Sequence, residues 1–341
     1  MVTLKDVAKA VGLSPKTVSR VVNDDPAVQA ATRELVQDAI RRLNYVPDYA
    51  ARMMRTTTSS VVGLMTDVVA TTPYSVDLVR GTQSALRERA QTMLIGNTEG
   101  DAATEREYWN VFQAHKVAGV IYATVHHRPV DLTGTDFERP LVLANCYSPR
   151  RDRPSIVPDD EGGGYTQARY LIERGHRRIG IVSLNPAIRA TALRGAGHRA
   201  AFAEGGLSFD PAFEVPGFVG PVMSEALVAY DAALRLLSAT DRPTAMICGN
   251  DRVAMQVYAA AATLGLAVPD DLSIIGFDDM SIITETLHPR LTSVALPYFD
   301  IGRIAVETLA AIARNTENAA TPLSQLVPCP LIERQSCRAI G

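Results

Sequence analysis

From residue 60 onward, short apolar segments alternate with amphipathic ones, and this alternation restricts the possible folds more than any other feature of the chain. Strands and helices that alternate in this way form a parallel sheet with helices on both faces. The pattern starts again after Asp159, so we expect two similar α/β lobes with a ligand cleft at the carboxyl ends of their strands. The expected strands are 61–65, 93–95, 120–122, 179–182, 245–248 and 274–276, and the expected helices are 76–90, 103–115, 165–174, 194–203, 224–238 and 253–264.

Ahead of these lobes, residues 1–58 predict an all-helical head. Thr3 and Asp6 have the spacing of a capping box at the start of an amphipathic helix, which Gly12 ends. A second helix follows after a turn of only three residues, and a third is expected over 30–43. Two short helices joined by such a tight turn are typical of a DNA-binding helix-turn-helix.

The second helix, expected over 15–22, has the side chains of a helix that reads DNA. Ser14 predicts its N-cap, and Pro15 suits its first position because no hydrogen bond is lost there. Lys16 and Arg20 can reach base edges, while shorter polar side chains can contact phosphates. The candidate DNA-contacting residues of this region are Thr3, Ser14, Pro15, Lys16, Thr17, Ser19, Arg20 and Asn23.

The charge distribution separates the head from the body. Residues 1–58 contain nine Lys/Arg and six Asp/Glu, a net charge of +3, whereas the remainder contains 25 and 31, a net charge of −6. A basic head on an acidic body fits a DNA-binding protein. Charged residues near the start and the lack of any apolar run of about 18 residues predict a cytoplasmic protein without a membrane segment. The four cysteines show no CxxC spacing and are expected to be reduced thiols.

Two stretches of the head, VTLKDVAKAVGLSPKTVSRVVND (2–24) and TRELVQDAIRRLNYVPDYAARMMR (32–55), resemble the N-terminal module of the LacI/GalR family of repressors. The resemblance implies that positions 15, 16 and 20 read bases and that 48–56 form a hinge, which becomes helical on the operator. It also implies that Met54, followed by Arg55, enters the minor groove as an apolar wedge. Asp48 and Gln29 depart from the residues that are usual in this family.

The body carries the same resemblance through GHRRIGIV, PTAMICGNDRVAMQ and VPDDLSIIGFDD, among other stretches. It implies the fold of a periplasmic sugar-binding protein with three crossovers between the lobes. We therefore expect a DNA-binding domain with its hinge over 1–58 and an effector-binding and dimerisation domain over 59–341. Lobe one is expected to take about 60–158 and 289–320, and lobe two about 159–288 and 321–341.

The resemblance also implies a set of pocket residues, and their chemistry suits a sugar. A carboxylate can accept hydrogen bonds from neighbouring hydroxyls, while a guanidinium and an amide donate them. The aromatic candidates offer flat faces to a sugar ring, with simple core packing as the alternative, and a structural hydrogen-bond network is the alternative for the polar ones. The candidate ligand-binding residues are Tyr74, Tyr122, Asn145, Arg194, Phe218, Asn250 and Asp278.

Other patterns point away from catalysis. The glycines at 162–164 lack the Lys-Ser/Thr of a phosphate loop and are interpreted as a helix start capped by Asp159 or Asp160. His126 and His127 have no cysteine or carboxylate at metal-ligand spacing, so they are expected to line the pocket or the surface. With no GxSxG motif either, we expect no catalytic residue, no metal and no cofactor.

These features together predict a sequence-specific DNA-binding regulator, a repressor that binds a palindromic operator as a homodimer with half-sites one helical turn, ~10 bp, apart. The expected effector is a sugar, an α-glucoside-like di- or oligosaccharide. The alternatives are a regulator that answers to a purine-like corepressor or a protein coregulator, and a solute-binding protein for transport.

Overall fold

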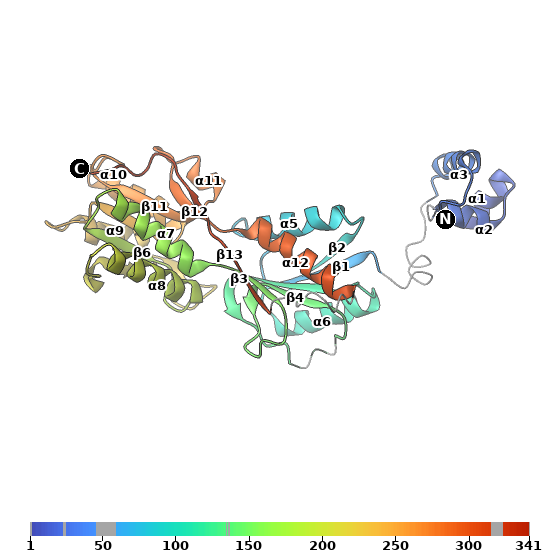
Figure 1. The fold of residues 1–341 in the computed structure, drawn as a ribbon, viewed down its shortest axis with the longest axis horizontal. Coiled ribbons are helices and arrows are strands. Elements are labelled where there is room, and N and C mark those ends of the chain that lie inside the picture. Colours follow the sequence, from blue (N-terminus) through green and yellow to red (C-terminus); the bar gives the residue numbers. More distant parts are fainter. Residues whose placement is uncertain are drawn as a thin grey trace. The chain divides into compact units, whose positions relative to one another are not determined.

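The computed structural model describes residues 2–22, 25–45, 59–133, 135, 137–314 and 323–340. The chain divides into two compact units, Met1–Ser59 and Ser60–Gly341 (Figure 1). Each unit has its own hydrophobic core. Within the described residues, no helix is both long and apolar enough to cross a lipid bilayer.

The first unit forms the three predicted helices, α1 (Leu4–Val11), α2 (Pro15–Val22) and α3 (Ala30–Leu43). The predicted capping box is present, because Asp6 N donates to Thr3 Oγ1 (3.4 Å) and Thr3 N donates to Asp6 Oδ2 (2.8 Å). Gly12 ends α1 at φ 66°, a conformation that glycine adopts at little cost. Ser14 Oγ accepts the Thr17 amide (3.1 Å), which caps α2. The core is built from Val7, Ala8, Val18, Val21, Val36 and Ala39.

Lobe one of the second unit is a six-stranded parallel sheet in the order β13-β5-β4-β3-β1-β2. Its strands are β1 (Val61–Thr66), β2 (Thr92–Asn97), β3 (Val120–Pro129), β4 (Leu141–Tyr147), β5 (Ser155–Pro158) and β13 (Ser324–Val327). Its helices are α5 (Val76–Arg87), α6 (Ala102–Ala114) and α12 (Tyr298–Ala313). Residues of α5 and α12 pack in one hydrophobic cluster and residues of α6 in another, so the helices cover both faces of the sheet (Figure 1).

Lobe two contains a second six-stranded sheet in the order β14-β12-β11-β10-β6-β7. Its strands are β6 (Ile179–Ser183), β7 (Glu214–Pro216), β10 (Ala245–Cys248), β11 (Ser273–Asp278), β12 (Thr292–Ala295) and β14 (Leu331–Ile332). Helices α7 (Asp160–Glu173) and α8 (Arg189–Glu204) pack in one cluster, and α9 (Ala229–Leu237) and α10 (Asp251–Thr263) pack in another. The two-lobed α/β body predicted from the alternating pattern is therefore confirmed.

The chain crosses between the two sheets three times, but the predicted lobe limits are wrong for the last two crossings. β12 pairs with β11 in lobe two (Thr292 opposite Ile275), although 289–320 was assigned to lobe one. β13 pairs with β5 in lobe one (Ser324 opposite Ser155), although 321–341 was assigned to lobe two. An interior strand such as β12 is buried in either sheet, so its sequence does not reveal which sheet it joins.

The helix expected over 224–238 is shorter than predicted, because its first part is a strand. β9 (Ala226–Leu227) pairs antiparallel with β8 (Phe218–Val219), and α9 begins only at Ala229. The hairpin is closed by a hydrogen bond from Val228 N to Gly217 O (2.8 Å). This hairpin carries Phe218 and the neighbouring Glu225 to the cleft between the lobes.

Candidate functional site

The exposed face of α2 presents two cations. Lys16 and Arg20 are exposed, whereas Val18 and Val21 of the same helix are buried. The valines hold the helix on its core, so the two long cations point to solvent at positions 16 and 20. Arg20 Nε donates to Asp25 Oδ2 (2.7 Å), which fixes one edge of its guanidinium group.

The other predicted DNA-contacting residues divide into three groups. Thr3, Ser14 and Pro15 are exposed, but Thr3 and Ser14 also cap helices, and Ser14 Oγ lies 2.8 Å from Thr17 Oγ1. Thr17 and Ser19 are half-buried on the sides of α2. Asn23, Met54 and Arg55 lie outside the described residues, as does the hinge predicted over 48–56.

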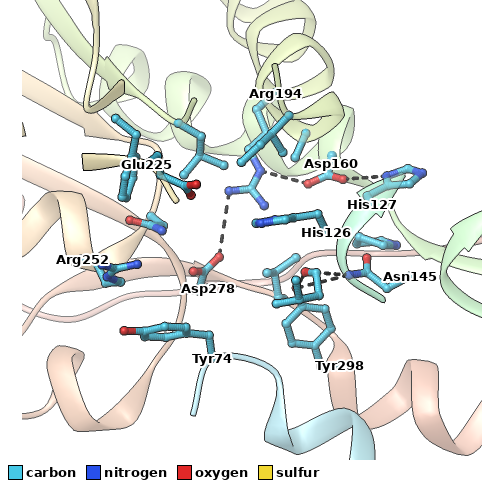
Figure 2. A pocket seen from close by; sticks show the side chains of 18 residues that line it. Tyr74, His126, His127, Asn145, Asp160, Arg194, Glu225, Arg252, Asp278 and Tyr298 are labelled. Atoms are coloured by element: carbon cyan, nitrogen blue, oxygen red, sulfur yellow. Dashed lines mark hydrogen bonds and ion pairs between the residues drawn. The ribbon is translucent and has the colours of Figure 1, made fainter. Parts of the chain in front are cut away.

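A cavity between the two lobes of the second unit collects most of the predicted ligand residues (Figure 2). Tyr74, Asn145, Arg194, Phe218, Asn250 and Asp278 all line it, and so do both histidines of the 126–127 pair. Its volume is about 100 Å³. The remaining lining residues are Val125, Pro158, Asp160, Leu184, Ile188, Ala190, Glu225, Arg252, Leu296 and Tyr298.

Arg194 is the buried centre of this cavity. Its Nε donates to Asp160 Oδ1 (2.9 Å) and its Nη1 donates to the Gly249 carbonyl (2.7 Å). Nη1 also lies 3.9 Å from Asp278 Oδ1, and the guanidinium carbon lies 3.5 Å from the centre of the Phe277 ring. A buried cation is stable only when carboxylates and acceptors surround it, and Arg194 has both.

Asp160 links Arg194 to the opposite lobe. Its Oδ2 lies 3.0 Å from Nδ1 of His127, at the end of β3 in lobe one (Figure 2). Burial alone would raise the pKa of Asp160, but Arg194 and His127 outweigh it and lower the pKa below its usual range. The sequence left open whether Asp159 or Asp160 caps α7. Asp159 does so by accepting the Gly162 amide (2.9 Å), which leaves Asp160 for the cleft.

Asp278 ends β11 and differs from Asp160 in its protonation. Burial raises the pKa of Asp278 to about 7, although the nearby Arg194 opposes the shift. At neutral pH the carboxyl group therefore exchanges between a form that only accepts hydrogen bonds and a form that also donates one. Either form can bind a ligand hydroxyl.

This pKa shift predicts a pH-dependent effect of Asp278→Asn. The folded-state pKa lies above the ordinary 3.8, so ionisation of Asp278 lowers stability as the pH rises from 3.8 to about 7. Asparagine stays neutral, so the variant should melt at a higher temperature than the wild type at about pH 8, and the difference should shrink towards about pH 5. Scanning calorimetry across this range measures it, and a difference that is the same at every pH would contradict the shift.

The two amide side chains of the cavity are already partly engaged. Asn250 Oδ1 accepts the Val253 amide (3.0 Å) as the N-cap of α10, and its NH₂ group could donate to a ligand in the cavity. Asn145 Nδ2 donates to the carbonyls of Thr124 (2.9 Å) and Val125 (3.1 Å). Asn145 therefore supports the end of β3 at the edge of the cavity.

Arg252, which sequence reasoning did not select, lies against two predicted aromatic contacts. Its guanidinium carbon is 4.9 Å from the centre of the Tyr74 ring in lobe one and 5.5 Å from that of Phe218 in lobe two. This cation–π arrangement joins the lobes across the cleft. Glu225, also not selected, has an enclosed Oε2 for which the described residues provide no hydrogen-bond partner.

Tyr122 does not line the cavity, and its assignment as a ligand contact is corrected. Its hydroxyl donates to Glu105 Oε2 (2.9 Å), and its ring stacks with Trp109 at 6.3 Å in the core between the sheet and α6. The sequence suggested that the strand ended at Tyr122, but β3 continues to Pro129 with a shift in register after Ala123. The end of the strand therefore brings the two histidines to the cleft.

Comparisons with known proteins agree with this architecture. Residues 3–48 match the model of bacterial regulatory proteins of the lacI family, and residues 168–337 match a periplasmic binding protein-like domain. The sucrose operon repressor of Escherichia coli is 32% identical over 98% of this chain and 100% of its own length. The transcriptional repressor PurR of Photobacterium profundum is 30% identical over 91% of each chain.

Solved structures give the same result. A LacI-family transcriptional regulator from Rhizobium etli is 43% identical, with a TM-score of 0.78 over 82% of this chain and 99% of its own. The lac repressor dimer bound to operator and the anti-inducer ONPF is 25% identical, with a TM-score of 0.80 over 99% of both chains. The chain belongs to the LacI family of bacterial regulatory proteins and is a DNA-binding transcriptional repressor whose activity responds to a ligand.

Proposed function

We propose that the effector is an uncharged sugar, a di- or oligosaccharide of the α-glucoside type, which binds in the cleft between the lobes. The observation that carries this proposal is the convergence of Arg194, Asn250 and Asp278 on one cavity. The hydrogen bonds of Arg194 described above use Nε and Nη1, which leaves the Nη2 donors for a ligand. Together with the Asn250 amide and the Asp278 carboxyl group, these Nη2 donors can form hydrogen bonds with neighbouring hydroxyl groups of a sugar.

The charge of the lining supports a neutral ligand over an anionic one. Two guanidinium groups, of Arg194 and Arg252, stand against the carboxyl groups of Asp160, Asp278 and Glu225. An anionic ligand would have to compete with these carboxyl groups for the arginine donors. The sucrose operon repressor matches this chain over 98% of this chain and 100% of its own length, and its name also supports a sugar ligand.

A purine-like corepressor is the second candidate, because PurR proteins are also relatives. A flat base would stack on Tyr74 or Phe218, but the Arg252 guanidinium lies over both rings. A purine would have to displace it or share the ring faces with it. This arrangement favours the sugar, whose hydroxyls can use the Arg252 donors directly.

We propose that the ligand acts by changing the angle between the lobes. The contacts of His127 with Asp160 and of Tyr74 with Arg252 cross the cleft, so a ligand that engages these residues binds the open and closed arrangements differently. Repressors of this family act as dimers on operator DNA, in the cytoplasm, and so does this chain. A homodimer couples the lobe angle to the spacing of its two DNA-reading helices on a palindromic operator.

A calorimetric panel tests the ligand class. We expect sucrose, maltose or trehalose to bind and to raise the melting temperature, with a stabilisation of about 2.7 kcal/mol at a ligand concentration 100 times Kd. Ribose and hypoxanthine should give smaller effects or none, and Asp278→Asn should abolish the response to the sugar. Binding of hypoxanthine alone would contradict the sugar proposal in favour of a purine. The absence of heat for every small molecule would favour a protein coregulator.

A further inference from the structure

The loop after α2 contains a carboxylate that holds the candidate base-reading arginine. Arg20 Nε donates to Asp25 Oδ2 at 2.7 Å. Asp25 is itself fixed on three other sides: its Oδ1 accepts the Ala27 amide (2.9 Å), its own amide donates to the Arg20 carbonyl (3.0 Å), and its carbonyl accepts from Arg33 Nη2 (2.7 Å). The carboxylate therefore has a defined position between α2 and α3.

This contact leaves the recognition edge of Arg20 free of Asp25. A guanidinium group has one N–H on Nε and two each on Nη1 and Nη2, and guanine offers the paired acceptors N7 and O6 in the major groove. With Nε bound to Asp25, the outer edge of the guanidinium group, with one N–H on Nη1 and one on Nη2, is the edge left for these acceptors. The Arg20 side chain is 47% exposed, so this end of the fork reaches solvent.

Asp25 stays charged at physiological pH. The hydrogen bond from Arg20, followed by that from the Ala27 amide, lowers the pKa of Asp25 below its ordinary value. The negative charge of Asp25 is fixed beside α2, the helix proposed to contact DNA. It repels DNA phosphates in complexes where Arg20 does not contact a guanine. The same charge orients the arginine where the base is present.

We propose that Asp25 is a positioning residue that sets the base preference of Arg20 at the operator. The inference rests on the proposed role of Arg20 as a base reader. An arginine held in one rotamer loses less conformational freedom on binding. The complex with guanine is therefore stabilised, whereas poorly aligned complexes with other bases are not. Asp25 thereby increases the difference in affinity between operator and random DNA.

The test uses the full chain and an operator selected from a randomised duplex pool. For Asp25→Ala we expect the ratio of operator to random-duplex affinity to fall about tenfold, the order of one bidentate base contact, with affinity for random DNA unchanged or higher. Selection from the same pool should show a relaxed preference at one base pair per half-site. In an Arg20→Ala background, Asp25→Ala should cause no further loss of specificity.

Two more variants separate positioning from folding and from net charge. Asp25→Asn keeps an oxygen for the Ala27 amide and should show the same loss of specificity with an unchanged melting curve. Asp38→Ala removes an equal charge from an exposed ion pair with Arg41 on α3 and should leave the base preference unchanged. A specificity ratio for Asp25→Ala equal to that of the wild type overturns the proposal. If Arg20→Ala itself leaves the base preference unchanged, the role of Arg20 fails first, and that of Asp25 fails with it.

Discussion

Replacing Arg194 with alanine is expected to abolish ligand binding and to destabilise the second unit by about 3–5 kcal/mol, the cost of leaving buried charges without their partner. The guanidinium group is almost fully enclosed and lies beside the carboxyl groups of Asp160 and Asp278. Without it, both buried carboxyl groups lose the cation that lies beside them. Asp160 would then lose the partner that contributes most to keeping its pKa low.

Denaturant unfolding and sugar calorimetry measure the two effects of this substitution. Arg199→Ala is the matched control, because Arg199 is an exposed residue of the same helix, α8. The control should retain stability and ligand affinity. An Arg194→Ala protein that unfolds at the wild-type denaturant concentration and still binds the sugar would show that the buried ion pair does not hold the cleft together.

Arg20→Ala is expected to reduce operator affinity about 10- to 100-fold, the effect of losing a bidentate contact with a base. Affinity for random duplex should fall far less, because only one cation is lost from the phosphate-contacting surface. Ligand affinity should not change, because the cleft is formed entirely by residues of the second unit.

Mobility-shift titrations on operator and random duplex at one fixed salt concentration measure this difference. Arg41→Ala is the control, since Arg41 is an exposed cation on α3 that is not a candidate base reader. Its loss should affect both duplexes alike and modestly. Equal losses on both duplexes for Arg20→Ala would show that Arg20 contacts phosphates only.

The helices of the first unit could be predicted because their ends depend on local chemistry. The Thr3–Asp6 capping box, the positive φ of Gly12 and the Ser14 cap each involve residues at most three positions apart. The carboxyl ends of β10 and β11 were predictable for a similar reason, and Asn250 and Asp278, which the family resemblance implied as pocket residues, follow or end these strands and line the cavity.

Other features depend on contacts between distant segments. β3 continues past Tyr122 through a shift in register between Ala123 and Arg128, so Tyr122 lies inside the lobe and His127 lies at the cleft. Arg252 follows Asn250 in sequence but finds its ring partner, Tyr74, in the other lobe. The local sequence does not indicate which sheet β12 joins, and it does not indicate that Arg252 contacts Tyr74.

Ligand control of sequence-specific DNA binding is tested most directly by titrating the selected operator with the full chain, with and without the sugar found in the panel. We expect operator affinity to change by a factor of about 5 to 150, with random duplex unaffected, and we expect Asp278→Asn to bind the operator without responding to the sugar. A protein that prefers no double-stranded sequence, with or without ligand, would contradict the proposed control, as would an operator affinity that bound sugar leaves unchanged.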